Sequence, residues 1–194
     1  MVAISSFLFG LCATLALASP INPDAETGVA AIEKRSSVTG TNGGYYYQFY
    51  DSGSGGKYSN GAGGKYTVSW SGSDDIVAGK GWSTGAARSI TFSGSFSGPI
   101  YFSVYGWFTN PLVDDGSTYE VYEGTRSNAP SIQGTSTFKQ YWSIRTSHRV
   151  SGTVTVGNHW NEWKKLGLPL GTPNYQIVAT EAFSGSGTAT ITVG

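Results

Sequence analysis

A short strand-like stretch of the chain ends in a lone carboxylate. It runs from Tyr175 to Glu181, is rich in β-forming residues and carries no charge before its last residue, which predicts a half-buried strand. Because side chains alternate along a strand, Tyr175 and Glu181 share one face, and a phenol and a carboxylate then look into the same space. A cleft is the natural place for such a face. The alternative is a glutamate at a strand end that merely meets solvent.

The aromatic content indicates what such a cleft would bind. The chain has 12 tyrosines, more than a core of this size can hold with every hydroxyl hydrogen-bonded, so many of them must line a surface. Aromatic faces stack on the apolar faces of sugar rings, while tyrosine hydroxyls bond sugar hydroxyls. A groove lined by Tyr and Trp therefore indicates a polysaccharide ligand. Aromatic residues spread singly over an ordinary sandwich are the alternative.

The elements that must hold such a cleft are strands. From residue 45 onward, short runs rich in Tyr, Val, Ile, Thr, Ser and Phe are separated by clusters of Gly, Ser and Asn. Nine such runs, many with small hydroxyl residues in alternation, predict an all-β sandwich in which one sheet face meets solvent. The runs are residues 45–50, 65–70, 88–96, 100–108, 118–122, 137–146, 153–156, 175–181 and 189–193.

One segment has a helical period instead. Asn158 can cap a helix, and Gly167 can end it. The apolar face of this helix carries Trp160, Trp163 and Leu166. We therefore expect a single α-helix at about residues 158–167 that packs against the sandwich, with both Trp side chains in the core rather than in contact with a ligand.

Charge and cysteine content exclude several ligand classes. The chain has 12 basic and 12 acidic residues and no block of one sign, which argues against nucleic acid and against anionic membranes. A neutral polymer fits such a surface better. The one cysteine, Cys12, lies in the N-terminal apolar segment, so no disulfide, zinc or iron–sulfur spacing occurs. No cofactor or metal is implied.

The first 35 residues are predicted to be removed. Residues 1–18 contain an apolar run closed by Ala-Leu-Ala, which is typical of a signal peptide, and residues 19–35 read as a pro-peptide that ends in the dibasic pair Lys34-Arg35. Residues 36–194 then suit one domain with a sizeable core. No other apolar run is long enough to span a bilayer, so we expect a secreted, extracellular monomer.

Six strings of the sequence are characteristic of one enzyme family. They are NGAGGKYTVSW (60–70), GKGW (79–82), VYGWFTNPL (104–112), RSNAPSIQGTSTFKQYWSIR (126–145), GNHWNEWKKLG (157–167) and YQIVATEAFSGSG (175–187). Through them the chain, from about Tyr45 to Gly194, closely resembles the family 11 glycoside hydrolases, the small secreted endo-β-1,4-xylanases. The resemblance implies a β-jelly-roll sandwich of two curved antiparallel sheets, a xylan-binding cleft under a thumb hairpin, and retaining hydrolysis by two opposed glutamates.

The same resemblance assigns roles to residues of the cleft. Glu181 matches the general acid/base, which protonates the leaving glycosidic oxygen, then deprotonates the attacking water, and needs a raised pKa to do so. Tyr105 and Tyr175 match tyrosines that hydrogen-bond the sugar and hold the nucleophile. The alternative for both tyrosines is packing, with the hydroxyl bonded inside the sheet.

Four further residues match substrate-binding positions. Arg126 and Gln140 match polar residues that bond sugar hydroxyls, although a surface ion pair is the alternative for Arg126. Pro130 lies in the thumb tip that covers a xylose unit. Tyr50 sits where many family members place a Trp as a sugar platform, so it stacks over less area.

The chain departs from the family after residues 110–112. Family members carry an apolar residue and then the nucleophilic Glu there, at the start of a Tyr-rich strand that is missing here with its turn. Asp114 alone occupies the nucleophile's place in line, and Asp115-Gly116 between two β-runs predicts a tight hairpin turn beside it. The remaining carboxylates fall at turns, outer strand positions or the helix: Asp51, Asp115, Glu120, Glu123 and Glu162.

One more carboxylate matches a position that tunes the acid/base. The stretch from Asp75 to Trp82 resembles the family strand whose Asn or Asp neighbours the general acid, and its Asp-bearing members work at more acidic pH. The alternative for Asp75 is a turn in a Ser- and Gly-rich segment.

Two functions remain for the whole chain. It is either an endo-β-1,4-xylanase or a lectin-like protein that binds xylan without cutting it, and a nucleophile opposite Glu181 discriminates between them.

Overall fold

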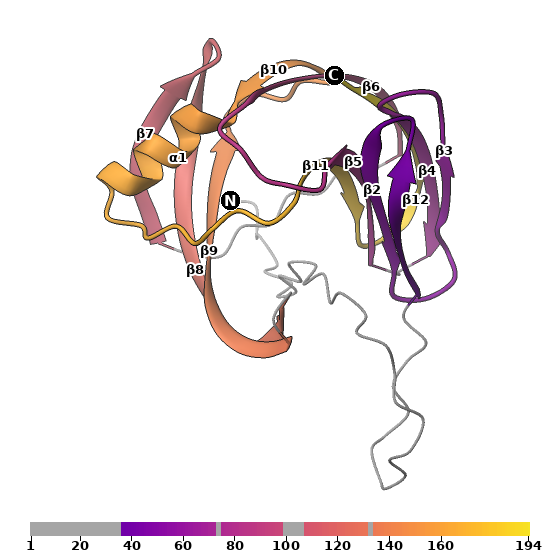
Figure 1. Ribbon diagram of the computed structural model, residues 1–194, viewed down its shortest axis with the longest axis horizontal. Helices are drawn as coiled ribbons and strands as arrows, with labels where there is room; N and C mark the ends of the chain where they lie inside the picture. Colours follow the sequence, from indigo (N-terminus) through magenta and orange to yellow (C-terminus); the bar gives the residue numbers. More distant parts are fainter. Residues whose placement is uncertain (1–35, 73–74, 99–106, 132–133) are drawn as a thin grey trace, which may run out of the picture.

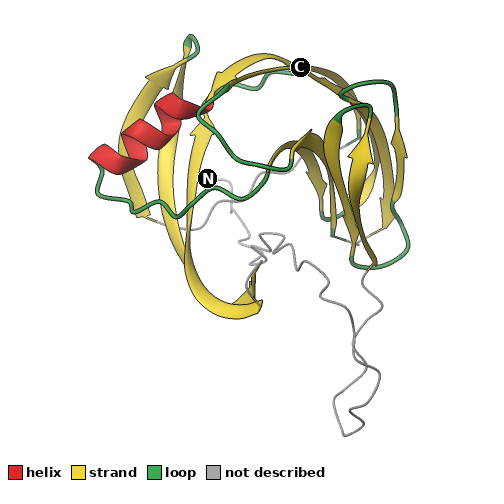
Figure 2. Cartoon of the chain, viewed as in Figure 1, coloured by secondary structure: helices red, strands yellow, loops and turns green. Residues whose placement is uncertain are grey.

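The computed structural model describes residues 36–72, 75–98, 107–131 and 134–194. Within these residues the chain forms twelve strands and one helix, which confirms the all-β prediction (Figures 1 and 2). The strands are β1 (Ser36–Asn42), β2 (Tyr45–Asp51), β3 (Lys57–Asn60), β4 (Lys65–Gly72), β5 (Ile76–Trp82), β6 (Ser89–Ser97), β7 (Trp107–Asp114), β8 (Ser117–Ser131), β9 (Gly134–Arg145), β10 (Ser151–Thr155), β11 (Gln176–Ala182) and β12 (Gly185–Val193). The helix is α1 (Val156–Lys165).

The described strands form three antiparallel sheets (Figure 1). Their strand orders are β1-β2-β5-β11, β10-β6-β12-β4-β3 and β7-β8-β9. This arrangement of antiparallel sheets with one helix confirms the predicted jelly-roll sandwich. Among the described strands, none pairs with both β11 and β7.

The main core lies between the four-stranded and the five-stranded sheet. Alternate residues of β4, β5 and β12 point into it, among them Tyr66, Ile76 and Ile191. Tyr66 is fully buried, and its hydroxyl lies 3.1 Å from the hydroxyl of Thr180 on β11, so a hydrogen bond also joins the two sheets. Burial raises the pKa of Tyr66 to about 12, so this phenol stays neutral in the core.

A lysine ammonium is buried at the edge of this core. Lys80 on β5 has no exposed surface, and its Nζ donates to Asn42 Oδ1 (3.0 Å), to the carbonyl of Gly61 (3.1 Å) and to the carbonyl of Gly63 (2.7 Å). All three ammonium protons thus have neutral acceptors. Burial lowers the pKa of Lys80. The side chain ties the β1–β2 turn to the loop before β4, so we expect it to matter for stability.

We expect Lys80→Met to lower the free energy of unfolding by about 2–4 kcal/mol, because Met keeps the apolar stem but leaves three acceptors unpaired in a buried place. Guanidinium unfolding of the variant measures the loss. Lys57→Met is the matched control, since Lys57 is exposed on β3 and should change stability by no more than about 0.5 kcal/mol. Equal unfolding midpoints for the two variants would contradict the role of the Lys80 hydrogen bonds.

A two-residue turn joins β7 to β8. Asp114 at the end of β7 faces Ser117 at the start of β8. The turn residues Asp115 and Gly116 have φ angles of 48° and 71°. Positive φ at both central positions is the type I′ geometry, which matches the twist of a hairpin and favours Asp-Gly. The predicted tight turn is confirmed.

α1 packs against the sheet β7-β8-β9, and Figure 1 shows it beside β7 and β8. Trp163 and Leu166 contact a small second core that includes Tyr119 and Val121. The indole nitrogen of Trp163 also donates to Ser143 Oγ at 2.9 Å. With ten residues, α1 is too short to cross a bilayer, and the described ranges hold no longer apolar helix that could.

The start of α1 differs from the prediction. The helix begins at Val156, which was expected to end a strand, and Thr155 rather than Asn158 is the N-cap. Thr155 donates from its backbone N–H (3.1 Å) and its hydroxyl (3.2 Å) to the carboxylate of Asp115. The β7–β8 turn thus supplies the negative charge that favours a helix N-terminus, which no reading of the local sequence would reveal.

The end of α1 agrees with the prediction. Gly167 has a φ of 76°, and its N–H donates to the carbonyl of Lys164. The N–H of Leu168 donates to the carbonyl of Trp163. This pair of bonds is the Schellman motif, in which a glycine in the left-handed region closes the helix.

Candidate active site

Glu181 belongs to a row of residues that crosses the four-stranded sheet. Glu181 on β11 faces Val77 on β5, and Val77 faces Tyr50 on β2. Directly opposed residues point to the same side of an antiparallel sheet, so these three side chains share one face. Thr180 and Ala182 are buried on the other face, whereas Glu181 is exposed. The carboxylate therefore stands on the face of the sheet that is turned away from the main core.

Two tyrosines extend this face. Tyr46 lies opposite Gly81, which is opposite Ile177 on β11, and the ring centroid of Tyr46 is 5.6 Å from that of Tyr175. Burial, and to a smaller extent the nearby Tyr46, raises the pKa of Tyr175 to about 12, and burial also raises the pKa of Tyr46. Both phenols keep their protons and can donate to a ligand. Sequence reasoning missed Tyr46, although its even spacing from Tyr50 places both on one face.

Backbone forms the floor of this face beside β11. Gly79 and Gly81 alternate with Lys80 and point to the side of Val77. A Cβ at Gly81 would lie 2.1 Å from the carbonyl oxygen of Gln176, and one at Gly79 would lie 2.7 Å from that of Val178. The two strands approach too closely there for side chains, so a ligand on this face meets bare backbone next to Glu181.

Asp75 lies on the same face, directly before β5. It is buried, its N–H donates to Ser52 Oγ at 2.7 Å, and its carbonyl accepts the N–H of Ser52 at 2.9 Å. Because Val77 is opposite Glu181, Asp75 is the diagonal neighbour of Glu181 across the two strands. Diagonal neighbours are about 7–8 Å apart at Cα, within reach of long side chains. The structure therefore brings the expected pKa-tuning residue to the side of the expected general acid.

The predicted polar residues Arg126 and Gln140 share one face of the three-stranded sheet. Arg126 faces Phe138 and Gln140 faces Gly124, in a regular register from β8 to β9. This face is turned away from α1, which packs on the alternate residues of the two strands. Glu120, expected at an outer position, lies on the same face as Arg126, and its carboxylate accepts a 2.7 Å hydrogen bond from the hydroxyl of Tyr122.

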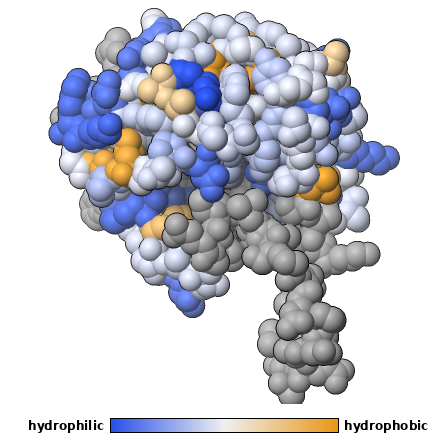
Figure 3. Space-filling view, viewed as in Figure 1, coloured by the Kyte–Doolittle hydropathy of each residue, from blue (hydrophilic) through white to orange (hydrophobic). Residues whose placement is uncertain are grey.

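Of the other predicted binding residues, the structure describes Tyr50 and the backbone of Pro130. Tyr50 lies in the row with Val77 and Glu181, but only 9 % of it is exposed, which leaves little of the ring for stacking. Pro130 lies in β8 opposite Thr135, after an irregularity at Asn128, whose φ is 50°. Tyr105 lies outside the described residues. On the side of the molecule seen in Figure 3, residues of polar or intermediate hydropathy cover most of the coloured surface and apolar ones are scattered.

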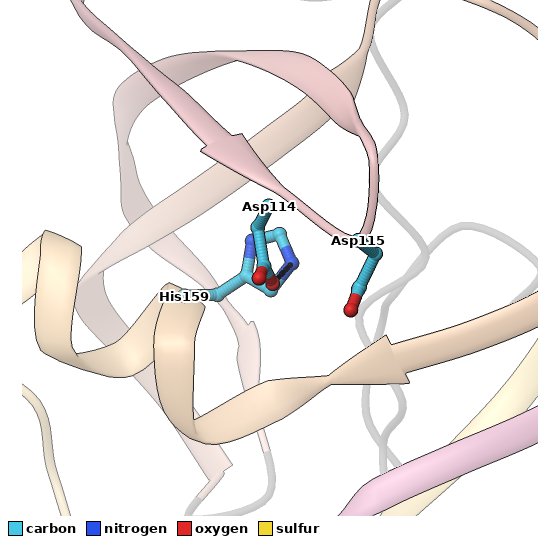
Figure 4. Close-up of side chains that lie close together, drawn as sticks. All are labelled: Asp114, Asp115 and His159. Atoms are coloured by element: carbon cyan, nitrogen blue, oxygen red, sulfur yellow. Dashed lines mark ion pairs between the residues drawn. The ribbon is translucent and has the colours of Figure 1, made fainter.

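Asp114 has its contacts on α1. Its Oδ1 accepts a 2.7 Å hydrogen bond from Asn158 Nδ2, and its Oδ2 is 3.5 Å from His159 Nε2 (Figure 4). Asp115, the next residue, is bound by Thr155. Both carboxylates of the turn are thus engaged by the N-terminal end of the helix. This position comes from tertiary packing and could not be read from the local sequence.

A pocket of the described residues lies away from the face of Glu181 and has no lining residue on β2, β5 or β11. It has a volume of about 560 Å³ and lies between α1, β9 and β10. Trp160, which was predicted to be in the core, is only half-buried and lines this pocket with Trp142 and Trp163. The helix is too short to cover the whole sheet, so one of its two Trp side chains stays at the rim.

The fold and the chain resemble those of characterised enzymes. Endo-1,4-beta-xylanase 11A of Botryotinia fuckeliana is 49% identical over 226 residues, an alignment that covers 100% of each chain. Endo-1,4-beta-xylanase B of Phanerodontia chrysosporium is 49% identical over 221 residues, which cover 100% of this chain and 76% of that relative. A solved structure from a comparison of two major endo-1,4-beta-xylanases of Trichodrema reesei superposes with a TM-score of 0.73 at 40% identity, covering 82% of this chain and 99% of that one.

The sequence profile of the glycosyl hydrolases family 11 matches residues 42–114 and 113–192. Together the two matches span both walls of the candidate site, including Glu181 and Arg126. They meet at the β7–β8 turn. The profile, the relatives and the superposed structure agree, and the chain belongs to family 11 of the glycosyl hydrolases.

Proposed function

We propose that this protein is a secreted endo-1,4-β-xylanase by descent, that Glu181 is its general acid/base, and that this form of the chain is catalytically impaired. The observation that carries the proposal is the exposed Glu181 in one row with Tyr50, beside the Tyr46–Tyr175 pair, in a chain whose relatives are named endo-1,4-beta-xylanases. Equal numbers of basic and acidic residues suit an uncharged polymer such as xylan.

The described residues can supply one half of a retaining mechanism. Glu181 would give its proton to the leaving glycosidic oxygen and later take a proton from the water that releases the sugar. Tyr46 and Tyr175 would donate hydrogen bonds to ring hydroxyls from one wall, and Arg126 and Gln140 would do so from the other. Tyr105 and Pro130 would complete the sugar-binding surface, as the family pattern implies.

For the second half of that mechanism, the sequence places only Asp114 in line with the family's nucleophile. Retaining hydrolysis needs a nucleophile about 5–5.5 Å from the acid/base, whereas Asp114 faces α1, with its Oδ1 bound by Asn158 and its Oδ2 3.5 Å from His159 Nε2. The alignment with the relative from Botryotinia fuckeliana has 226 positions for the 194 residues of this chain. Together with the break in the profile match at residues 113–114, this supports a segment missing between β7 and its turn.

The contacts of Asp114 favour one other function, in which a lectin-like cleft binds xylan and does not cleave it. Affinity electrophoresis in gels that contain xylan, run beside an assay of reducing sugar, separates the two. Retarded migration without sugar release supports the impaired enzyme, and Tyr46→Phe should weaken the retardation. If the protein is not retarded and releases no sugar, the proposed substrate class is refuted for this chain. Sugar release that Glu181→Gln abolishes would show an intact enzyme.

Removal of residues 1–35 and a monomeric mature form remain proposals. N-terminal sequencing of material from the culture medium should begin at Ser36, after Lys34-Arg35. A start at Ser19 would show that the acidic segment stays attached. Light scattering of the same material measures the mass, and a value twice that of the processed chain would contradict a monomer.

In an active form that carries the missing strand, we expect Asp75→Asn to move the pH optimum for xylan hydrolysis upward by about one unit. Asp75 is buried diagonally across from Glu181, and the family resemblance associates an Asp at this position with a more acidic optimum, so a neutral Asn should remove that acid shift. The measurement is kcat/KM against pH. Glu162→Gln on α1 is the control and should leave the profile unchanged, and an unchanged profile in Asp75→Asn as well would contradict the coupling.

A further inference from the structure

A second cluster of ionisable groups lies where the β7–β8 turn meets α1. It consists of Asp114, Asp115 and His159, each of which offers one ligand atom within 4.8 Å of the other two (Figure 4). Two of the residues are adjacent in sequence and the third is far along the chain, so the fold brings them together. Neither xylan binding nor the acid/base chemistry of Glu181 uses this cluster.

His159 is the observation that points to a ligand. It is 6 % exposed, and neither of its ring nitrogens has a hydrogen-bond partner. Oδ2 of Asp114, 3.5 Å from His159 Nε2, is also buried without a hydrogen-bond partner. Helix capping accounts for Asp115, whose oxygens accept from Thr155, but it leaves these buried atoms unsatisfied. Buried polar atoms without a partner are rare because each costs about 1–3 kcal/mol.

The spacing suits one shared cation. Zinc binds a histidine nitrogen at about 2.0–2.1 Å and a carboxylate oxygen at about 2.0–2.2 Å, so two ligands of a tetrahedral site are about 3.3–3.5 Å apart. The observed 3.5 Å between Asp114 Oδ2 and His159 Nε2 matches this separation.

We propose that Asp114, Asp115 and His159 bind a divalent transition-metal ion of the Zn²⁺ type, which fastens the β7–β8 turn to the start of α1. Three protein ligands leave the fourth tetrahedral position to water. One imidazole and two carboxylates favour Zn²⁺ or Co²⁺ over the all-oxygen sites that Ca²⁺ and Mg²⁺ prefer. The role is structural, because the contacts of the cluster are on the helix side of the sheet.

Neighbouring groups position the three ligands. Asn158 Nδ2 holds Oδ1 of Asp114, and the Tyr119 ring stands edge-on to the His159 ring with centroids 4.7 Å apart at 84°. Arg149 is the positive group near His159, but two carboxylates outweigh its one charge. His159 also lines the 560 Å³ pocket beside α1, which gives an ion a route from solvent.

The test is a zinc titration of the full chain, produced without a polyhistidine tag and stripped with a chelator. Isothermal titration calorimetry with ZnCl₂ should show one site per chain, and CoCl₂ should give the visible absorption of a tetrahedral site. At a Zn²⁺ concentration about 100 times Kd, the thermal midpoint should rise by about 5–10 °C. MgCl₂ at the same concentration should produce no such rise.

The two histidines of the chain provide a matched pair of variants. His159→Gln should weaken zinc binding at least about 100-fold, whereas His148→Gln, at an exposed position, should leave it unchanged. Asn158→Ala removes an outer partner and should weaken binding about 10- to 100-fold without touching a ligand, and it keeps the test valid if His159→Gln does not fold. Glu181→Gln should bind zinc normally. Absence of binding at millimolar Zn²⁺, or equal binding by His159→Gln, would overturn the proposal.

Discussion

Purified as written, the protein should release reducing sugar from xylan about 10⁴-fold or more slowly than a version in which the missing strand is restored. Retaining hydrolysis needs two carboxyl groups about 5–5.5 Å apart on rigid strands. Asp114 is at a turn, with one oxygen held by Asn158 at 2.7 Å and the other 3.5 Å from His159. Its side chain is also one methylene shorter than that of Glu, and a misplacement of about 1 Å can cost about 100-fold in rate.

The restored version carries, between Val113 and Asp114, the residues that the 11A xylanase of Botryotinia fuckeliana has at that point of the alignment. Both proteins are assayed for reducing ends on the same xylan. Asp114→Asn should change neither rate, and Glu181→Gln should abolish the rate of the restored version. Comparable turnover by the unmodified chain, lost in Asp114→Asn, would show that Asp114 serves as the nucleophile after all.

Gly64→Ala should lower the free energy of unfolding by about 3 kcal/mol or more, and the thermal midpoint by about 6–12 °C. Gly64 is buried just before β4, and its carbonyl accepts the N–H of Val193 at 3.1 Å. A Cβ at this position would lie 1.8 Å from the carbonyl oxygen of Val193. No side-chain rotation relieves a clash between two backbones, so the end of β12 must move away from β4.

The control for this prediction is Gly171→Ala. Nothing lies within 4 Å of a Cβ at Gly171, which is exposed between α1 and β11. Alanine there should leave stability unchanged or raise it by about 0.4–1 kcal/mol, because it restricts the unfolded chain. Calorimetric scans measure the thermal midpoints of both variants. Equal midpoints would mean that β12 and β4 can separate at that end at little cost in free energy.

Strands whose pattern reports a buried face were predictable from the sequence, and strands held by backbone pairing alone were not. The run at residues 65–70 alternates apolar and polar residues, and β4 buries its Tyr66, Val68 and Trp70. β1 has no such pattern, yet all seven of its residues pair with β2. An edge strand of this kind needs only hydrogen-bonding groups from its neighbour, so its side chains carry no signal.

The candidate site likewise has features that the sequence predicts and features that it does not. The face shared by Glu181 and Tyr50 follows from alternation within each strand, but their meeting in one row depends on the register through Val77. The burial of Lys80 depends on acceptors from two separate loops. The engagement of Asp114 by α1 likewise depends on a contact between segments about 40 residues apart. Contacts of this kind are set by packing and leave no trace in a short window of sequence.

The order β10-β6-β12-β4-β3 puts the last of the described strands in the middle of its sheet. β4 and β6 are synthesised before it, and each must wait for residues 185–193 before it gains its partner. The sheet therefore cannot close until β12 has left the ribosome, and until then the edges of β4 and β6 that β12 will cover stay open. A premature stop codon after β11 would deprive both halves of the sheet of the strand that joins them.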